Sequence, residues 1–580
     1  MRPEPGALVA RVLTDVAGVD KPFDYLVPPE LASGIRVGTL VRVDLVGRRV
    51  GAWVAEVGVE PPDGLALLPI AKIRGWGPEP EVVALTEWAA WRWAGRRSAL
   101  LATASPETAV TRLPVPARRR PAPPPPTGLL SDLPLDRPVI VRLPPAADAT
   151  AVVAELAQRG PTLAVVPSVS RGEVLARRLR RAGGDVAVVP DEWARARAGV
   201  AVVVGARAAA WASCPGLAAI VVIDGHDESL GQEQAPTWNA VTVVAERARR
   251  AGVPCVVVSS CPTLELLAAG AVRVLDRRRE RQGWAALEVV DRRGDDPRLG
   301  LYSERLVSLI RAQPRVVCVL NRTGRARLLA CSACGELARC ERCGTALAQQ
   351  RAAETPPTLA CPQCGLTRPQ VCAACGSTRL RQLRVGVSRA REELEALAGR
   401  PVGEVTAASP GLPDADVLVG TEAVLRRVSP ADGFGAIVFV DFDQELLAAR
   451  IKAGEEALAL LAHASRLVGG RAGRVLVQTR LPDHPVIQAA LRADPAILSD
   501  AEQEVRRALR LPPVTAVALV SGPGAPEYVE GLRTQPLEIL GPDRDQWLVK
   551  GADAATLADA LAAVPRPPGR LRVAVDPARL

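Results

Sequence analysis

Eight of the twelve cysteines in this 580-residue chain lie between residues 331 and 375 and form four C-x-x-C pairs. This spacing lets two thiolates bind one tetrahedral zinc ion, so four pairs supply ligands for two sites of four thiolates each. Four protein thiolates leave no open coordination position, and both zinc ions are therefore expected to be structural rather than catalytic. The pairs are Cys331 and Cys334, Cys340 and Cys343, Cys361 and Cys364, and Cys372 and Cys375.

Disulfides and redox C-x-x-C motifs are the alternative readings of such pairs. The sequence contains no recognisable signal peptide and no run long and apolar enough to span a membrane, which favours a reduced, cytoplasmic protein and hence zinc. A glycine follows every pair, as a zinc knuckle needs where the backbone turns its N–H groups towards the sulfurs (Gly335, Gly344, Gly365 and Gly376). We expect two structural Zn²⁺ ions and no membrane partner.

The charge balance is mildly basic, with a formal net charge of +10. Such an excess suits a polyanionic partner but is weak evidence alone. Arginine supplies nearly all of it, because the only lysines are Lys21, Lys72, Lys452 and Lys550. With 48% hydrophobic residues, the chain can build several domain cores.

The first 137 residues divide into two parts. Residues 1–78 alternate apolar and polar in short runs and predict a small β-rich domain. In residues 79–137, an amphipathic helix over 81–104 precedes a stiff, proline-rich linker at 114–128. The helix carries Trp88, Trp91 and Trp93, which we expect to pack against a neighbouring domain rather than to stack on bases.

Continuous apolar runs alternate with helical segments in residues 138–285, the pattern of buried parallel strands with crossover helices. A second lobe of this kind spans 286–330 and 377–499, with the cysteine-rich segment 331–376 inserted in it. Residues 500–580 predict a small α+β domain. The fold class is thus multidomain α/β.

Several segments occur in one order that resembles PriA, the family of bacterial primosomal replication-restart helicases: "KPFDYLVP", "NRTGRA" before the cysteines, "ADVLVGTEAV", "HASRLVGGRAGR" and the terminal "VAVDP". The resemblance implies a 3′-DNA-end-binding β domain, two RecA-like helicase lobes and a double zinc-ribbon insertion. It also implies nested zinc sites, with the two outer cysteine pairs together and the two inner pairs together. Implied partners are forked and single-stranded DNA, other primosome proteins, the helicase loader and single-strand-binding protein.

The motor of that family is altered in this chain. Where the family has G-x-x-x-x-G-K-T to cradle phosphates, this chain has "VIVRLPPAADAT". The loop from Leu143 to Thr150 contains no glycine, and Pro144 and Pro145 lack the N–H groups that a phosphate would need. No lysine occurs between Lys72 and Lys452. We do not expect ATP to be bound here in the usual manner.

The family's D-E-E-H motif is matched by "DGHD". Asp224 could still help to bind a metal ion, but Gly225 replaces the glutamate that should activate water. His226 and Asp227 follow, and because neighbouring strand residues point to opposite sides, we expect a locally satisfied remnant rather than a catalytic pair. Arg471 and Arg474 in "VGGRAGR" match the arginine-finger segment, with their placement left open.

The DNA-end motif is better preserved. Phe23, Asp24 and Tyr25 match the family's F-D-Y, and Gly47 and Lys72 are the expected counterparts of the remaining pocket wall. An aromatic ring can stack on a terminal base, a carboxylate can accept a hydrogen bond from a free 3′-OH, and a lysine can contact the last phosphate. The alternative is an ordinary strand with core aromatic residues.

The family also has a winged-helix domain between the end-binding module and the first lobe, and too few residues remain here to form one. Three functions stay open. The first is a fork-binding replication-restart protein that helps to reload the replicative helicase without helicase activity of its own. The second is an ATP-dependent 3′–5′ helicase with a rebuilt nucleotide site. The third is a zinc-ribbon nucleic-acid binder unrelated to replication.

Overall fold

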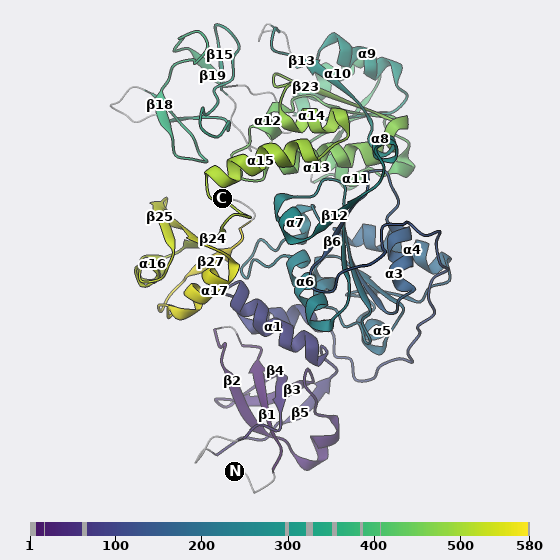
Figure 1. Ribbon diagram of the computed structural model, residues 1–580, viewed down its shortest axis with the longest axis vertical. Coiled ribbons are helices and arrows are strands. Elements are labelled where there is room, and N and C mark those ends of the chain that lie inside the picture. Colours follow the sequence, from purple (N-terminus) through teal and green to yellow (C-terminus); the bar gives the residue numbers. More distant parts are fainter. Residues whose placement is uncertain are drawn as a thin grey trace.

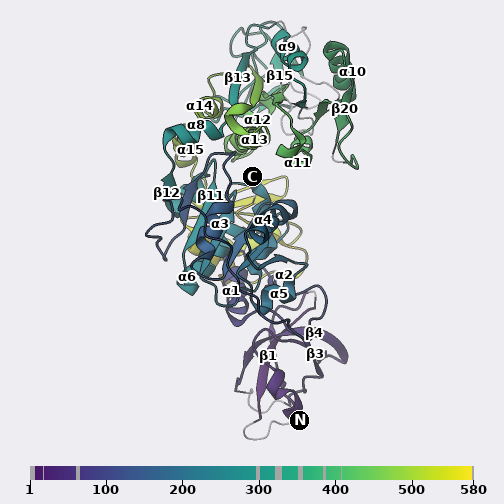
Figure 2. The ribbon, with the colours of Figure 1, turned by 90° about the vertical axis from the view of Figure 1, so that its right-hand side faces the viewer.

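The computed structural model describes residues 7–16, 18–60, 66–295, 301–320, 329–350, 357–382, 387–406 and 408–577. The "NRTGRA" segment lies outside these residues. Two stacked α/β lobes form the body of the molecule, with the N-terminal domain at one end and the cysteine-rich insertion beside the second lobe (Figures 1 and 2). None of the described helices is long and apolar enough to cross a bilayer.

The N-terminal domain is an antiparallel five-stranded sheet in the order β2-β1-β4-β3-β5. Its strands are β1 (Val9–Thr14), β2 (Pro22–Leu26), β3 (Leu40–Leu45), β4 (Arg48–Val57) and β5 (Lys72–Gly75), with the 3₁₀ helix η1 (Pro29–Gly34) between β2 and β3. The two edges approach each other, because the Leu26 amide donates to the Leu68 carbonyl at 3.0 Å and Leu26 pairs with Pro69. The sheet therefore curls into a barrel, as alternating apolar residues in short strands allow.

Two helices follow where a single helix over 81–104 was expected, namely α1 (Pro80–Arg92) and α2 (Arg97–Ala104). The chain breaks at Ala94, whose φ is +44°, and at Gly95, where a Cβ atom would lie 2.4 Å from Pro236. Trp93 is fully buried against the first lobe, and the Trp91 indole donates to Asp559 of the C-terminal domain at 2.9 Å. The expectation that these tryptophans pack against neighbouring domains is confirmed.

Residues 105–138 contain no helix and no strand beyond a single bridge between Ala117 and Val200. The proline-rich segment 114–128 runs in extended form along the edge of the first lobe. This stretch leaves no room for a winged-helix fold.

The first lobe is a seven-stranded parallel sheet in the order β12-β6-β11-β10-β7-β9-β8. Helices cover both of its faces, and the strands are apolar because both faces are buried. Its elements are β6 (Val139–Arg142), α3 (Thr150–Ala157), β7 (Thr162–Val165), α4 (Val169–Arg181), β8 (Val186–Val189), α5 (Trp193–Ala198), β9 (Val202–Gly205), η2 (Arg207–Trp211), β10 (Ala219–Ile223), η3 (Glu228–Leu230), α6 (Ala240–Ala251), β11 (Cys255–Ser259), α7 (Leu264–Ala269), β12 (Ala271–Val274) and α8 (Arg277–Gly283).

The second lobe is a six-stranded parallel sheet in the order β13-β23-β22-β14-β21-β20. Its elements are β13 (Ala286–Asp291), α9 (Glu304–Ala312), β14 (Val316–Val319), α10 (Val387–Ala398), β20 (Val402–Val405), β21 (Val417–Gly420), α11 (Ala423–Arg427), η4 (Pro430–Asp432), β22 (Ala436–Phe439), α12 (Asp443–Leu446), α13 (Ala453–Leu467), η5 (Gly470–Ala472), β23 (Arg474–Thr479) and α14 (Pro485–Arg492). The insertion interrupts this lobe between β14 and α10 with five short strands: β15 (Leu329–Cys331), β16 (Ala348–Gln350), β17 (Thr358–Ala360), β18 (Thr367–Pro369) and β19 (Leu380–Gln382).

Helix α15 (Ala496–Ala508) packs on α13 and α14 of the second lobe, so it belongs to that lobe although residue 500 was the expected boundary. The small domain beyond it is an antiparallel sheet in the order β25-β26-β24-β27 with two helices. Its elements are β24 (Ala516–Ser521), α16 (Ala525–Leu532), β25 (Glu538–Asp543), β26 (Gln546–Gly551), α17 (Ala554–Ala563) and β27 (Arg572–Val575). It shares one continuous apolar core with α1 and the first lobe.

Candidate functional site

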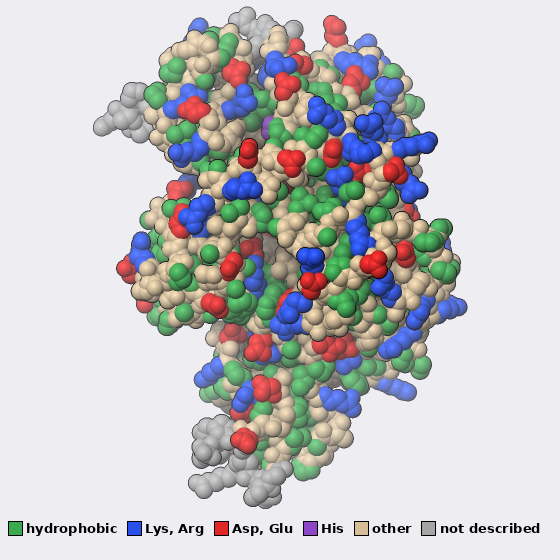
Figure 3. Space-filling view, viewed as in Figure 1, with side chains coloured by type: hydrophobic (Ala, Val, Ile, Leu, Met, Phe, Trp, Pro, Cys, Tyr) green, Lys and Arg blue, Asp and Glu red, His purple; other side chains and the backbone are tan. Residues whose placement is uncertain are grey.

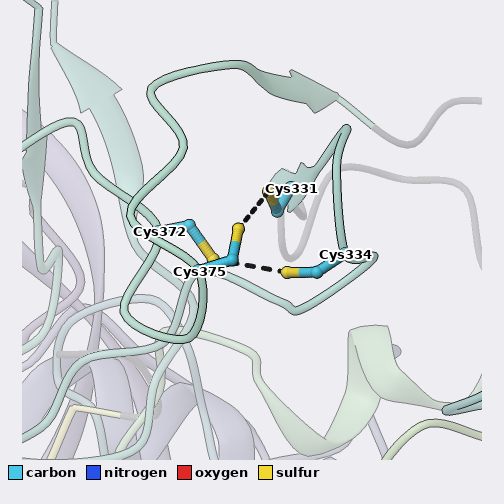
Figure 4. Close-up of side chains that lie close together, drawn as sticks. All are labelled: Cys331, Cys334, Cys372 and Cys375. Atoms are coloured by element: carbon cyan, nitrogen blue, oxygen red, sulfur yellow. Dashed lines mark hydrogen bonds between the residues drawn. The ribbon is translucent and has the colours of Figure 1, made fainter.

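The cysteine-rich insertion brings its eight thiols into two groups of four. The outer pairs converge in one group, with Cys331 and Cys375 sulfurs 3.5 Å apart and Cys334 and Cys372 sulfurs 3.6 Å apart (Figure 4). Within each group all four sulfurs lie within 4.8 Å of one another. Sulfurs of a tetrahedral zinc site lie about 3.8 Å apart at the usual Zn–S distance of about 2.3 Å, so both groups fit one zinc ion each.

The inner group joins Cys340 to Cys364 at 3.5 Å and Cys343 to Cys361 at 3.4 Å between sulfurs. The nested arrangement expected from the family resemblance is therefore present. The glycines after the pairs all have φ between +71° and +78°, and each amide donates to the carbonyl of the first cysteine of its pair. These tight turns also aim amides at sulfur, as the Ala333 N–H does at Cys331 Sγ at 3.4 Å.

The junction between the lobes is held by a charged group at the end of β10. Asp224 is 4% exposed, and Arg466 of α13 in the second lobe binds both of its carboxylate oxygens, at 2.5 and 3.0 Å. Arg171 of α4 adds a third contact at 3.0 Å. Burial alone would raise the pKa of Asp224, but the charges of Arg466 and Arg171 outweigh burial and lower it. A magnesium ion at Asp224 would have to displace both guanidinium groups.

The same arginine also contacts the loop after β6. Arg466 Nε donates to the carbonyl of Pro145 at 2.8 Å. The loop packs tightly on its other side, because a Cβ atom on Gly283 would lie 2.4 Å from Pro144 Cβ and the Ala146 amide donates to the Gly283 carbonyl at 3.1 Å. The glycine-free loop is thus wedged between α8, which ends the first lobe, and the second lobe.

Gly225 lies against the neighbouring strand β11. Its amide donates to the Val258 carbonyl at 2.9 Å, and a Cβ atom at this position would lie 2.2 Å from Val257 Cγ1. Any side chain here, including the glutamate of the family motif, requires the Val257 side chain or the backbone to shift. Glycine at position 225 therefore fits the close packing of this segment against β11.

His226 and Asp227 are each satisfied locally, as expected. His226 Nδ1 lies 2.8 Å from the Ser259 hydroxyl, and burial lowers the pKa of this imidazole. Asp227 caps the short helix η3 by accepting from the Ser229 amide at 2.9 Å. No direct hydrogen bond joins the two side chains among the described contacts.

Arg471 and Arg474 are both exposed, in η5 and at the start of β23. The structure thus brings Arg466, and neither of the two arginines singled out from the sequence, to Asp224. Sequence reasoning missed both Arg171 and Arg466. Arg466 stands in the segment "HASRLVGGRAGR", five residues before Arg471, but nothing in that segment indicates that its side chain reaches Asp224.

A second charged cluster joins the lobes at α7. Arg506 of α15, only 1% exposed, contacts Glu455 at 3.1 Å and Glu265 at 3.6 Å, and Lys452 contacts Glu265 at 2.9 Å. Glu455 also accepts from the Leu264 amide at 2.7 Å. Residues of α7 in the first lobe are therefore tied to α13 and α15 of the second.

The predicted DNA-end residues lie on and around the barrel, on different faces. Tyr25 points into the barrel core, is 4% exposed and donates from its hydroxyl to the Asp44 carbonyl at 2.6 Å. Burial raises the pKa of Tyr25. Phe23 lies partly buried on the same side of β2, with the Lys21 ammonium 5.3 Å from its ring centroid. The Phe23 ring is therefore more accessible to a base than the Tyr25 ring.

Asp24 points to the outer face of β2 and is bound by Arg11 of β1 through two contacts, at 2.9 and 3.2 Å. The Asp24 side chain is 9% exposed and Arg11 is 34% exposed. The hydrogen bonds that Arg11 donates to Asp24 raise the pKa of Arg11. Arg11 was not singled out from the sequence, because nothing in "RVLT" distinguishes it from other strand arginines.

Gly47 and Lys72 are both exposed. Gly47 occupies the β3–β4 turn at φ +75°, where its amide donates to the Asp44 carboxylate at 2.9 Å. Lys72 begins β5 and pairs with Arg42 of β3. Asp44 thus hydrogen-bonds to both Tyr25 and Gly47. Asp24 instead contacts Arg11, and Lys72 pairs with Arg42.

Comparisons with known proteins agree with this architecture. The family of the PriA 3′DNA-binding domain (3′BD) matches residues 11–106, which covers the barrel, α1 and α2. The replication restart protein PriA of Bacillus subtilis is 27% identical over 365 residues, covering 57% of this chain and 44% of that protein. The probable replication restart protein PriA of Mycobacterium tuberculosis is 31% identical over 412 residues, covering 67% of this chain and 60% of that protein. The chain spans about half the length of the first curated relatives it matches.

Among solved structures, S. cerevisiae Dbp5 bound to RNA and ADP BeF3 is 11% identical, covers 64% of this chain and 89% of that chain, and gives a TM-score of 0.36. Mycobacterium smegmatis helicase Lhr bound to ssDNA and AMP-PNP gives a TM-score of 0.34 at 13% identity, covering 75% of this chain and 59% of that chain. TM-scores this low add nothing to the assignment.

The barrel matched by the PriA 3′DNA-binding domain family, the two parallel-sheet lobes and the double four-cysteine insertion together indicate a multidomain α/β DNA-binding protein. Within that class, the chain is similar to the PriA replication restart proteins over more than half of its length.

Proposed function

We propose that this protein binds stalled or abandoned DNA forks and helps to reload the replicative helicase, without hydrolysing ATP itself. The proposal joins three parts of the molecule: the barrel that holds a DNA 3′ end, the lobes that serve as a rigid body, and the zinc-binding insertion that recruits protein partners.

One observation supports the proposal that the protein does not hydrolyse ATP. Arg466 spans the junction between the lobes and binds both Asp224 and the Pro145 carbonyl, where the family places its metal-binding aspartate and its phosphate loop. Phosphoryl transfer depends almost wholly on positioned charge and magnesium. Here the aspartate is already neutralised by two arginines, and the loop offers a carbonyl to an arginine instead of N–H groups to a phosphate.

Recognition of a 3′ end is supported by the barrel. The Phe23 ring is partly accessible for stacking, Asp24 keeps lone pairs beyond those used by Arg11, and Lys72 and Gly47 are exposed. Stacking and phosphate contacts of this kind bind DNA without sequence preference, which a protein acting at forks of any sequence requires.

Recruitment of a partner is assigned to the insertion. It projects from the second lobe beside α15, on the side of the molecule away from the barrel (Figure 1). Closed four-thiolate sites stabilise small knuckles without catalysing a reaction, and they leave the surface around them free for protein contacts.

The test measures single-turnover ATP hydrolysis with and without forked DNA, alongside fork binding by the same preparation. We expect tight fork binding and no DNA-stimulated phosphate release. Robust hydrolysis that disappears in Asp224→Ala would instead identify a helicase with a rebuilt nucleotide site.

A further inference from the structure

The proline-rich segment 114–128 is fixed along the edge of the first lobe by a series of hydrogen bonds. The Ala117 amide donates to the Gly199 carbonyl at 3.0 Å, and the Ala122 amide donates to the Ala182 carbonyl at the end of α4 at 2.7 Å. Between these points Arg119 exchanges two bonds with Asp185, since its amide donates to the carboxylate at 2.7 Å and its carbonyl accepts from the Asp185 amide at 2.8 Å. The segment is part of the folded surface of the lobe.

This arrangement places two groups of arginines side by side. The segment carries Arg118, Arg119 and Arg120, all exposed, and it lies against the last turn of α4 and the residues after it. The last two turns of α4 carry Arg177, Arg178 and Arg181, also exposed. We call these six residues the basic edge. In Figure 3, Lys and Arg side chains gather along the lower right margin of the first lobe.

Neighbouring carboxylates neutralise only part of the basic edge. Arg177 and Arg178 contact Glu173 and Asp148, at 3.8 and 2.9 Å. The Asp185 carboxylate is engaged by a backbone amide, and Glu192 is engaged by Arg180 and Arg195. Within the part of the chain that the structure describes, the Arg119 and Arg181 side chains have no carboxylate at ion-pair distance.

The chemistry of the basic edge fits a duplex rather than a single strand. Its groups are guanidinium ions on an extended segment and a helix, which suit a row of phosphates. Binding of a single strand relies on aromatic rings that stack on bases, and none of the large apolar residues described as exposed is aromatic. Trp193, the aromatic residue of the adjoining helix α5, is 6% exposed.

The basic edge is also continuous with the barrel. Arg197 of α5 donates to the Gly77 carbonyl at 3.1 Å, and Arg36 and Arg197 each lie 5.2 Å from the Trp76 ring centroid. The barrel is therefore held against the part of the first lobe that carries the segment.

We propose that the basic edge binds the phosphate backbone of the duplex arm of a fork, as a second DNA contact beside the 3′-end site. This inference rests on the proposed fork binding. It adds the substrate class for a surface on the first lobe: double-stranded DNA, read without sequence preference.

The test compares two fluorescein-labelled forks that share a 3′-OH end at the junction and differ only in a long or a very short duplex arm. Affinity is measured by anisotropy over a series of salt concentrations, for the full chain and for the triple variant Arg119→Gln/Arg120→Gln/Arg181→Gln. The matched control is Arg507→Gln/Arg533→Gln/Arg570→Gln, which removes three exposed arginines from α15 and the C-terminal domain.

On the long-arm fork, we expect the triple variant to lower the slope of log affinity against log salt by about 2 to 3, at about 0.9 for each phosphate that the variant no longer neutralises. The short-arm fork and the control variant should show little change. An unchanged slope, or an equal loss on both forks and on single-stranded DNA, would overturn the inference. The proposed function is tested separately, by comparing the affinities for a 3′-OH and a 3′-phosphate end on the short-arm fork.

Discussion

Arg466 in the second lobe binds Asp224 in the first lobe through two hydrogen bonds, of 2.5 and 3.0 Å, across the junction between the two lobes. This ion pair joins the two lobes directly through opposite charges.

Removing the arginine should loosen this junction. Arg466→Ala leaves Asp224 buried with Arg171 alone, and loss of one partner of a buried pair costs about 3 kcal/mol. We expect a lower midpoint in urea unfolding of the full chain, while fork binding persists under native conditions. Arg471→Ala, at an exposed position five residues away, is the matched control and should leave the midpoint unchanged. Equal midpoints for the two variants would contradict a stabilising role for the pair.

The same pair predicts how stability depends on pH. The arginines lower the pKa of Asp224 in the folded state, so its carboxylate contributes stability that is fully present above the unfolded-state pKa of about 4. That contribution is lost as pH falls through the folded-state pKa. Comparison of the parent with Asp224→Asn by thermal unfolding should show a gap that is constant between pH 5 and pH 7 and narrows below about pH 4. A gap that widens on acidification would contradict this assignment.

If the chain has no motor, Asp224→Ala should leave fork binding and partner recruitment unchanged. The parent should release no phosphate in response to DNA. Fork binding is measured by anisotropy and phosphate release by a coupled assay, on one preparation.

The metal content should be two zinc ions per chain. Because Cys361 belongs to the inner group, Cys361→Ser should release one zinc ion and unfold that part of the insertion, while binding of forks through residues 1–78 survives. Zinc is counted by mass spectrometry under native conditions, and fork affinity is measured in parallel. A parent with a single zinc ion would rule out the nested sites.

Asp24 should discriminate a free 3′-OH from a 3′-phosphate. A carboxylate that accepts a hydrogen bond from the hydroxyl must instead face a phosphate, and a charged bond of this kind is worth roughly 1.5 to 3 kcal/mol, or about tenfold to a hundredfold in affinity. Asp24→Ala should weaken binding to 3′-OH forks by that factor and narrow the gap to 3′-phosphate forks.

The Arg11–Asp24 pair requires a control. Removal of Asp24 also frees the charge of Arg11, so the loss of the hydrogen bond to the 3′-OH must be separated from the effect of a freed guanidinium group. Glu56→Ala removes the other carboxylate near Arg11, 3.5 Å away, without touching Asp24, and should preserve discrimination. If Asp24→Ala and Glu56→Ala behave alike, the F-D-Y segment is only part of the barrel.

Lys72→Ala should act differently from Asp24→Ala. An exposed ammonium group on β5 contributes a phosphate contact, so its removal should lower affinity for both ends and reduce the salt slope by about one unit. A change confined to one type of 3′ end would place Lys72 at the terminal sugar instead.

The sequence predicted the features that depend on local pattern. Apolar runs predicted both parallel sheets, and the C-x-x-C spacing predicted two zinc sites. The break between α1 and α2 could not be predicted, because it depends on the close approach of Gly95 to Pro236, far away in the sequence. The ion pair of Arg466 with Asp224 likewise joins residues 242 positions apart, and the pattern of apolar residues along the sequence cannot predict such a contact.

Residue type alone also could not separate the members of the F-D-Y segment. Alternation along β2 places Tyr25 in the core and Asp24 on the outer face. Only the register of β1 on β2 shows that Arg11 lies opposite Asp24.

The continuous core shared by α1, the first lobe and the C-terminal domain has a geometric consequence. Buried charges also join the two lobes. The barrel and the zinc-binding insertion therefore lie at opposite ends of one rigid body (Figure 1). A partner held at the insertion would stand at a constant offset, measured along the DNA, from a 3′ end held in the barrel. The length of the protein body, rather than a power stroke, would then set where on the fork that partner is delivered.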